Sequence, residues 1–267
     1  MPFRFPGSFF LIAGPCVLED EGLNLAIARH VADVSERTGA PAIFKASFDK
    51  ANRTSADSPR GPGLERGLEL LAEIRAATGL PLLTDVHEPR QAEEAASVVD
   101  VLQIPAFLCR QTDLLVSAGA TGRSVNVKKG QWMAPELMRH SVAKVRASGG
   151  TDVAVTERGT AFGYGRWVVD MRSFPLMRES CECPVIFDAT HSVQLPGGAG
   201  HASGGEPQYI ETLARAAVAA GADGLFVEVH PRPAEAASDG SNMLALDRLE
   251  PLLADLLRLR SAVAATA

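Results

Sequence analysis

The chain is 267 residues long, with 22% charged and 46% hydrophobic residues, a composition typical of a soluble globular protein. This length suits one large α/β domain or two small ones, and it is ample for a full hydrophobic core. The net charge of −6 excludes a broadly basic surface, so we expect no nucleic-acid or membrane partner. An anionic ligand would require positive charge concentrated in one site.

The apolar run at residues 8–16 predicts a first strand rather than a secretion signal. The run is short, Pro15 fits a cleavage position poorly, and acidic residues follow at once. No apolar run of the sequence is long enough to cross a membrane. Four cysteines in a chain of this length, without a secretion signal, indicate a cytoplasmic protein with no disulfide framework.

Short β-rich runs alternate with amphipathic stretches along the chain. The predicted strands cover residues 9–13, 42–46, 81–85, 101–104, 124–128, 152–157, 185–188 and 224–228. The predicted helices cover residues 23–38, 64–78, 90–97, 112–118, 135–148, 167–180, 207–220 and 242–263. Eight such units predict a (β/α)8 TIM barrel that spans residues 1–267 as one domain. A doubly wound sheet is the competing fold, but the first turn lacks the glycine-rich motif expected there.

Polar residues gather where the predicted strands end, which is where barrel active sites lie. The second strand runs into residues 45–55, which contain two lysines, Arg53, Asn52 and three hydroxyl side chains. Arg and Lys bind phosphate or carboxylate through charge-assisted hydrogen bonds, so this run predicts an anion site. Taken alone, a solvated loop with a lysine stem against the core explains the same residues equally well.

The next four strand ends continue the pattern. In chain order they supply Asp85 and His87, Gln103 and Arg110, Asn126 and Lys128, and Arg158. Lys128 and Lys129 must point to opposite faces of their strand, and we expect Lys128 to enter the barrel because it shares a face with Asn126. The charge for two phosphates and a carboxylate would then meet at the barrel mouth, from Lys45, Lys50, Arg53, Lys128 and Arg158.

Cys16, His191, Glu228 and Asp239 are far apart in sequence, but barrel closure makes the first, seventh and eighth strands neighbours. A thiolate, an imidazole and two carboxylates suit Fe²⁺, Zn²⁺ or Mn²⁺ better than Mg²⁺. Each residue also has a simpler interpretation: Cys16 as a buried apolar thiol, His191 as a hydrogen-bonded core histidine and Asp239 as a helix cap or turn residue. The Cys-Glu-Cys run at 181–183 also resembles a metal pair, but it precedes the seventh strand at the opposite end, and we interpret its thiols as structural or incidental.

A glycine-rich stretch at residues 194–205 follows the seventh strand. So flexible a segment at a barrel mouth predicts a lid, although a connector without a function is the alternative.

These segments together resemble the 3-deoxy-D-manno-octulosonate 8-phosphate synthase family. The matching motifs are AGPC at 13–16, FKASFDKANR at 44–53, TDVHEP at 84–89, QIPAFLCRQTD at 103–113, NVKK at 126–129, ERG at 157–159, FDATHSVQLPGG at 187–198 and SD at 238–239. They cover nearly the whole chain in order. The resemblance implies a transferase that condenses phosphoenolpyruvate with D-arabinose 5-phosphate and water, releasing phosphate, in lipopolysaccharide biosynthesis.

The resemblance also assigns roles to residues. It implies that phosphoenolpyruvate is bound by Lys45, Lys50, Gln103, Lys128 and Arg158, and the aldose phosphate by Asn52, Arg53 and Thr54, with Asp85 among the substrate-binding residues. The counterpart of Arg110 reaches a neighbouring subunit's site, which implies a homo-oligomer, usually a tetramer.

Cysteine at the position of Cys16 marks the metal-dependent members of this family, whereas asparagine marks the metal-independent ones. The resemblance therefore implies one divalent metal ion per subunit, Fe²⁺, Zn²⁺ or Mn²⁺, bound by Cys16, His191, Glu228 and Asp239. We count Lys45, Lys50, His191 and Asp239 as the catalytic residues. Whether the metal orients the aldehyde or lowers the pKa of a bound water stays open at this point.

The nearest alternative is the related synthase that uses erythrose 4-phosphate. It shares the barrel and the four metal-ligand types, but typically has Lys-Pro-Arg where this chain has Lys50-Ala51-Asn52-Arg53. A catalytically inactive sugar-phosphate-binding protein is an alternative from another class, and retention of all the candidate ligands argues against it.

Overall fold

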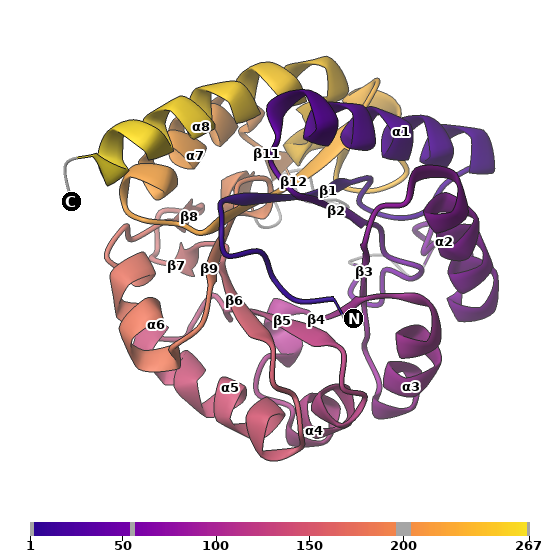
Figure 1. The fold of residues 1–267 in the computed structure, drawn as a ribbon, viewed down its shortest axis with the longest axis horizontal. Coiled ribbons are helices and arrows are strands. Elements are labelled where there is room, and N and C mark those ends of the chain that lie inside the picture. The colour runs from indigo at the N-terminus through magenta and orange to yellow at the C-terminus, as the bar shows by residue number, and fades with distance from the viewer. Residues whose placement is uncertain (1–2, 54–56, 196–203, 266–267) are drawn as a thin grey trace.

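Eight parallel strands close into a barrel in the computed structural model, which describes residues 3–53, 57–195 and 204–265 (Figure 1). The strands are β1 (Phe10–Gly14), β2 (Ala42–Lys45), β3 (Leu82–Asp85), β4 (Val101–Ile104), β5 (Ser124–Lys128), β6 (Val153–Glu157), β9 (Val185–Asp188) and β12 (Gly224–His230). Each strand pairs with the next, and β1 pairs with β12 to close the ring. The predicted (β/α)8 fold is confirmed, and the predicted strand ends are correct to within two residues.

The helices form a ring around the barrel (Figure 1). They are α1 (Glu21–Thr38), α2 (Leu64–Thr78), α3 (Pro89–Val98), α4 (Thr112–Ala120), α5 (Met138–Ala147), α6 (Ser173–Cys181), α7 (Ile210–Ala219) and α8 (Leu249–Ala264). Capping residues in the sequence set the ends of the helices, as α1 illustrates. The Asp20 side chain accepts a hydrogen bond from Leu23 N at 2.9 Å where α1 begins, and Gly39 ends the helix with a φ of 71°. No helix of the described ranges is long and apolar enough to cross a membrane.

Two predicted helices begin too early. Residues 167–168 belong instead to a short antiparallel pair, β7 (Thr160–Ala161) with β8 (Trp167–Val168), because an aromatic and a β-branched residue suit a strand. Residues 244–245 form β13 (Leu244–Ala245), which pairs with the extended end of β12. The two ends of the predicted lid pair with each other as short antiparallel strands, β10 (Gln194–Leu195) and β11 (Gly204–Gly205). Residues 196–203 of that stretch lie outside the described residues.

Side chains alternate between the barrel interior and the helix layer. Phe10 and Ile12 of β1 belong to an inner apolar cluster, whereas Leu11 and Ala13 pack into the larger core beneath the helices. The N-terminal segment crosses one end of the barrel (Figure 1) and adds Phe5 to the inner cluster. This end, where the strands begin, is therefore closed by apolar side chains, and the other end is left for polar ones.

Candidate active site

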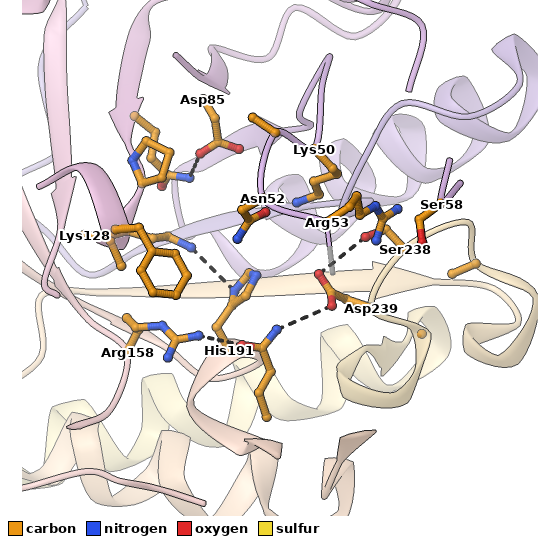
Figure 2. Close-up of a pocket in the computed structure, with 18 of the residues that line it drawn as sticks. Lys50, Asn52, Arg53, Ser58, Asp85, Lys128, Arg158, His191, Ser238 and Asp239 are labelled. Atoms are coloured by element: carbon orange, nitrogen blue, oxygen red, sulfur yellow. Dashed lines mark hydrogen bonds between the residues drawn. The ribbon is translucent and has the colours of Figure 1, made fainter. Parts of the chain in front are cut away.

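A cavity of about 770 Å³ opens at the carboxyl ends of the barrel strands, a volume typical of small-molecule sites (Figure 2). Ten residues predicted from the sequence line it: Lys45, Lys50, Asn52, Arg53, Asp85, Gln103, Lys128, Arg158, His191 and Asp239. The barrel therefore brings together residues that are up to 194 positions apart in the chain (239 minus 45).

Lys45 lies at the floor of the cavity, at the end of β2, and is 1% exposed. Its Nζ donates to Glu228 Oε1 at 2.7 Å and to the carbonyl of Cys16 at 2.9 Å, and Asp85 Oδ2 lies 3.9 Å away. Gly14 allows this approach, because a Cβ atom there would lie 2.0 Å from the Lys45 carbonyl oxygen. The buried ammonium thus holds the ends of β1, β2 and β12 in contact.

Both carboxylates beside Lys45 are held ionised. Burial alone would raise the pKa of Asp85, but Lys45 and Lys50 outweigh it and hold that pKa well below its usual range. For Glu228, burial is likewise outweighed, chiefly by Lys45 and His191, and the pKa is again low. Burial would lower the pKa of Lys50, but the Cys16 sulfur and the carboxylates of Glu228 and Asp85 outweigh it and raise that pKa. Lys50, Asp85 and Glu228 therefore stay ionised near neutral pH.

A chain of hydrogen bonds runs across the barrel from this floor. Gln103 Nε2 donates to Asp85 Oδ1 at 2.5 Å, and Asn126 Nδ2 donates to Gln103 Oε1 at 2.8 Å. Thr156 Oγ1 completes the chain by donating to Asn126 Oδ1 at 2.8 Å, and Ser47 Oγ donates to Asp85 at its other end. Because every member of this buried chain has a partner, the Gln103 amide that lines the cavity has a fixed orientation.

Lys128 enters the barrel, as predicted, whereas Lys129 points outward and lies 3.5 Å from Glu157 Oε1. Lys128 Nζ donates to Asp188 Oδ2 at 2.6 Å and sits 3.7 Å from the centre of the Phe226 ring. Burial, with repulsion from Lys45, lowers the pKa of Lys128, although Asp188 partly offsets this effect. Without a bound anion, the ammonium charge of Lys128 is therefore balanced mainly by the face of the Phe226 ring and by the Asp188 carboxylate.

His191 follows β9 and is oriented by the same aspartate. The His191 Nδ1 atom lies 2.7 Å from Asp188 Oδ2. Burial alone would raise the pKa of Asp188, but His191 and Lys128 outweigh it and hold that pKa well below its usual range. An ionised carboxylate only accepts hydrogen bonds, so Nδ1 carries the proton. The other nitrogen, Nε2, faces Glu228 Oε2 at 3.7 Å. A carboxylate bonded to one histidine nitrogen is the usual support for a metal ligand on the other.

Arg158 and Asp239 are joined through a residue that the sequence did not single out. Arg158 Nη2 donates to Gln194 Oε1 at 2.6 Å, and Gln194 Nε2 donates to Asp239 Oδ1 at 3.4 Å (Figure 2). The guanidinium is also 5.2 Å from the Trp167 ring. Burial lowers the pKa of Arg158. Gln194 had appeared only within the predicted lid and the motif at 187–198, with no role of its own, and its contact with Arg158 depends on the turn after β9.

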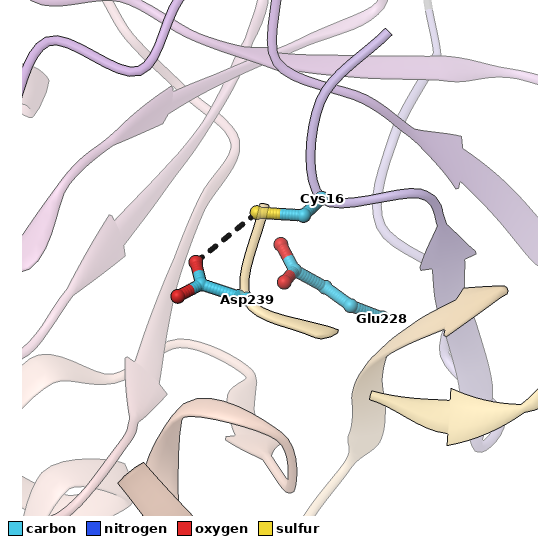
Figure 3. A group of neighbouring side chains, drawn as sticks. All are labelled: Cys16, Glu228 and Asp239. Carbon is cyan, nitrogen blue, oxygen red and sulfur yellow. Dashed lines mark hydrogen bonds between the residues drawn. The ribbon is translucent and has the colours of Figure 1, made fainter. Parts of the chain in front are cut away.

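Cys16, Glu228 and Asp239 form a possible metal-binding group (Figure 3), in which one ligand atom of each lies within 4.8 Å of the others. Cys16 Sγ lies 3.2 Å from both Asp239 Oδ2 and Ser238 Oγ. Burial, together with the charge of Glu228, raises the pKa of the Cys16 thiol well above its usual value. A divalent cation would replace that thiol proton and balance the negative charge, so this donor set fits a divalent transition-metal ion. His191 is outside the three-residue group, although its Nε2 is next to Glu228.

The β2 loop forms one rim of the cavity. Asn52 is exposed and lines the opening, and Arg53 donates to Pro59 O at 2.8 Å and to Ala237 O at 3.1 Å. Thr54 lies outside the described residues. Arg110 is exposed, and it is not among the described residues that line the cavity.

Phe226 is another site residue that sequence reasoning missed. It is a fully buried aromatic residue of β12, so nothing in the sequence separated it from the barrel core. Ser47 was missed for a similar reason: it belongs to the quoted run after β2, but its contact with Asp85 depends on the register of β2 and β3.

Comparison with known proteins shows the family of this chain. Residues 7–264 match the model of the DAHP synthetase I family. The chain belongs to this family. A relative from Syntrophotalea carbinolica is 56% identical over 253 residues, which are 95% of this chain and 91% of the relative. Relatives from Nitratidesulfovibrio vulgaris DP4 (97% of this chain, 94% of the relative) and Koribacter versatilis (95% and 92%) are each 58% identical. All three are named 2-dehydro-3-deoxyphosphooctonate aldolase.

Proposed function

We propose that this chain condenses phosphoenolpyruvate with D-arabinose 5-phosphate and water to give 3-deoxy-D-manno-octulosonate 8-phosphate and inorganic phosphate. The observation that carries the proposal is one cavity with two separate cationic regions. Lys128 and Arg158 lie on one side, and Arg53 belongs to the β2 loop on the other. Two anionic substrates need such an arrangement, and the relatives' shared name is that of an enzyme for this product.

The reaction forms one carbon–carbon bond and breaks one bond to phosphate. Carbon 3 of phosphoenolpyruvate attacks the aldehyde carbon, the oxygen of water adds at carbon 2, and the phosphate leaves. The two water protons end on the new hydroxyl groups or on the released phosphate. Both substrates carry negative charge, so the protein must first offset their repulsion.

The buried cations meet that requirement. Lys128 is only 6% exposed and Arg158 only 4%, so an anion bound between them is screened little by solvent. The Asp188 and Gln194 contacts hold both cations in position before the substrate binds, which lowers the cost of reorganisation. Gln103, fixed through Asp85 and Asn126, presents its amide to the same space.

We further propose that the chain belongs to the metal-dependent class, with one Fe²⁺, Zn²⁺ or Mn²⁺ ion held by Cys16, Glu228, Asp239 and the Nε2 atom of His191. When bound, such an ion polarises an oxygen of the aldehyde or lowers the pKa of water. Asp239 flanks this position and is the nearest candidate to hold or move a proton there. The protein's own contribution is the orientation of His191 by Asp188.

Substrate choice and metal dependence can be tested in one assay. We expect phosphate release from phosphoenolpyruvate with arabinose 5-phosphate, much slower release with erythrose 4-phosphate, loss of activity after chelation, and recovery with added Fe²⁺, Zn²⁺ or Mn²⁺. Preference for erythrose 4-phosphate would replace the proposed substrate. Full activity in the metal-stripped enzyme would contradict the proposed metal dependence but not the proposed substrates.

The Cys16→Asn variant tests the ligand set. Asparagine is an oxygen ligand without the thiolate charge, so we expect measurable activity with a weaker need for metal. Cys109→Ala is the matched control, because Cys109 is equally buried but contacts Met133 rather than the metal-binding group. Metal dependence unchanged by Cys16→Asn would exclude Cys16 as a ligand.

We propose a cytoplasmic homo-oligomer, a tetramer, in which Arg110 completes the cavity of a neighbouring subunit. The exposed Arg110 side chain supports this, as do the Phe107 and Trp132 rings nearby, which stack 6.1 Å apart and are 56% and 54% exposed. Mixing Arg110→Ala with an inactive Lys45→Met variant should restore part of the activity, because some cavities in mixed oligomers are then complete. No recovery in oligomers shown to have exchanged subunits would reject the shared site.

A further inference from the structure

Cys181 and Cys183 flank Glu182 where α6 ends, at the opposite end of the barrel from the cavity. Both thiols are free in the structure. Glu182 has φ 50° and ψ 48°, the left-handed region, and Asp239 is the only other non-glycine residue in the described part of the chain with a positive φ. A residue with a Cβ atom adopts this conformation only at a cost in free energy, so the tight turn between the two cysteines is an uncommon feature.

This turn brings the two cysteines to a distance suited to a disulfide. With helical dihedral angles, of either hand, residues i and i+2 have Cα atoms about 5.4 Å apart, as follows from a rise of about 1.5 Å and a radius of about 2.3 Å. Disulfides join Cα atoms about 4.4–6.8 Å apart. An extended middle residue would separate the same atoms by about 6.6 Å, at the limit of that range.

The surroundings favour a reactive thiol pair. Ser180 Oγ lies 3.7 Å from the Cys181 sulfur, and the Cys183 side chain is close enough to act on the same sulfur. Arg146 Nη2 donates to the Glu182 carbonyl at 2.9 Å, which fixes the turn and brings a positive charge close. The interaction with Cys183, helped by Ser180 and by the charges of Arg146 and Arg139, outweighs burial and lowers the pKa of Cys181 to about 7.

The two thiols differ in access. Cys181 is 1% exposed, whereas Cys183 is half-buried and can be reached from solvent. One sulfur is thus open to a small reagent, and the other is held beside it.

We propose that Cys181 and Cys183 form a reversible dithiol–disulfide site that exchanges with small disulfides such as oxidised glutathione. Cys183, the more accessible thiol, loses its proton to solvent, and its sulfur attacks the small disulfide and releases one thiolate. The Cys181 thiolate, whose proton has also gone to solvent, then attacks the Cys183 sulfur and releases the second thiolate. The two released thiolates take up two protons from solvent. Two thiols are oxidised and one small disulfide is reduced to two thiols, so atoms and electrons balance. The proposal does not depend on the proposed function.

The test is equilibration of the folded, metal-stripped protein in glutathione buffers that contain chelator, followed by alkylation and peptide mass spectrometry. We expect a Cys181–Cys183 disulfide, seen as the loss of two hydrogens from one peptide, that millimolar dithiothreitol reverses. The Cys109→Ala variant should behave like the unchanged protein. Two reduced thiols under oxidising buffer, a product that stops at the mixed disulfide with glutathione, or linkage only between chains would each overturn the proposal.

A second pair of variants tests the turn itself. Glu182→Gly keeps the left-handed conformation without cost, so the disulfide should form at least as readily as in the unchanged protein. Glu182→Val relaxes the turn toward extended backbone, so the equilibrium constant for disulfide formation should fall about tenfold. Equal constants for these two variants would show that the turn does not bring the thiols together.

Discussion

The two ends of the barrel interior are filled in opposite ways. Where the strands begin, Phe5, Phe10 and Ile12 form an apolar cluster with the neighbouring strands. Where the strands end, Lys45 and Glu228 are as deeply buried, but as an ion pair. Apolar side chains of similar volume usually stabilise a fold as well as buried ion pairs do, or better. The buried charges at the carboxyl end therefore point to ligand binding rather than to stability, and the two ends should respond differently to substitution.

Lys45→Met should have the largest effect. Its removal leaves Glu228 and Asp85 without their main counter-charge, so we expect activity to fall about 10³-fold and the free energy of unfolding to fall by about 3 kcal/mol. Phosphate-release kinetics and urea unfolding measure the two effects. Lys144→Met is the matched control, because Lys144 bonds to Thr112 at the surface. Activity within about twofold of the unchanged enzyme would mean that the charged floor serves packing alone.

Phe10→Ala tests the apolar end. Phe10 is fully buried and its ring lies 5.9 Å from that of Phe5, so its removal leaves a cavity and should lower the free energy of unfolding by about 3–5 kcal/mol. The catalytic constants measured well below the melting temperature should change by less than about twofold, since the ring is far from the reacting groups. Phe162→Ala, at a ring that is 66% exposed, should leave stability nearly unchanged. A large loss of activity in folded Phe10→Ala would show that the two ends are coupled.

Asp188→Asn sharpens the comparison within the charged end. The carboxylate holds the proton on His191 Nδ1 and pairs with Lys128, and loss of such a support typically weakens metal binding about 10–100-fold. Metal content after dialysis against graded free Zn²⁺ measures this directly. Asp170→Asn, which changes a surface carboxylate paired with Arg172, is the control. Unchanged metal affinity would exclude His191 as a ligand oriented by Asp188.

The sequence was most informative where a periodic pattern determined the structure. Eight apolar runs with intervening amphipathic stretches were enough for the barrel, and the alternation along β5 correctly assigned Lys128 to the interior and Lys129 to the exterior. The meeting of Cys16, Glu228 and Asp239 followed from barrel closure, which makes β1 and β12 neighbours.

Features that depend on tertiary contacts could not be predicted. Phe226 beneath Lys128 looks like any core aromatic residue, and Gln194 binds Arg158 only through the turn after β9. The strand at Trp167–Val168 forms because it has a partner in β7, whereas its sequence also continues the pattern of the following helix. Local propensity is a weak guide where a short segment takes its structure from a neighbour.

The smallest predicted effect concerns the pH dependence of stability at Asp85. Its folded-state pKa lies below the unfolded value near 3.8, so the carboxylate contributes stability that is present above about pH 4 and is lost as the pH falls. Asp85→Asn removes this contribution. The difference in unfolding free energy between the two proteins should therefore be greatest near pH 7 and shrink steadily from pH 4 to pH 3. Urea unfolding at each pH measures it, with the exposed Asp33→Asn as control. A difference that stays constant down to pH 3 would mean that Asp85 acts through its hydrogen bonds to Ser47 and Gln103 rather than through its charge.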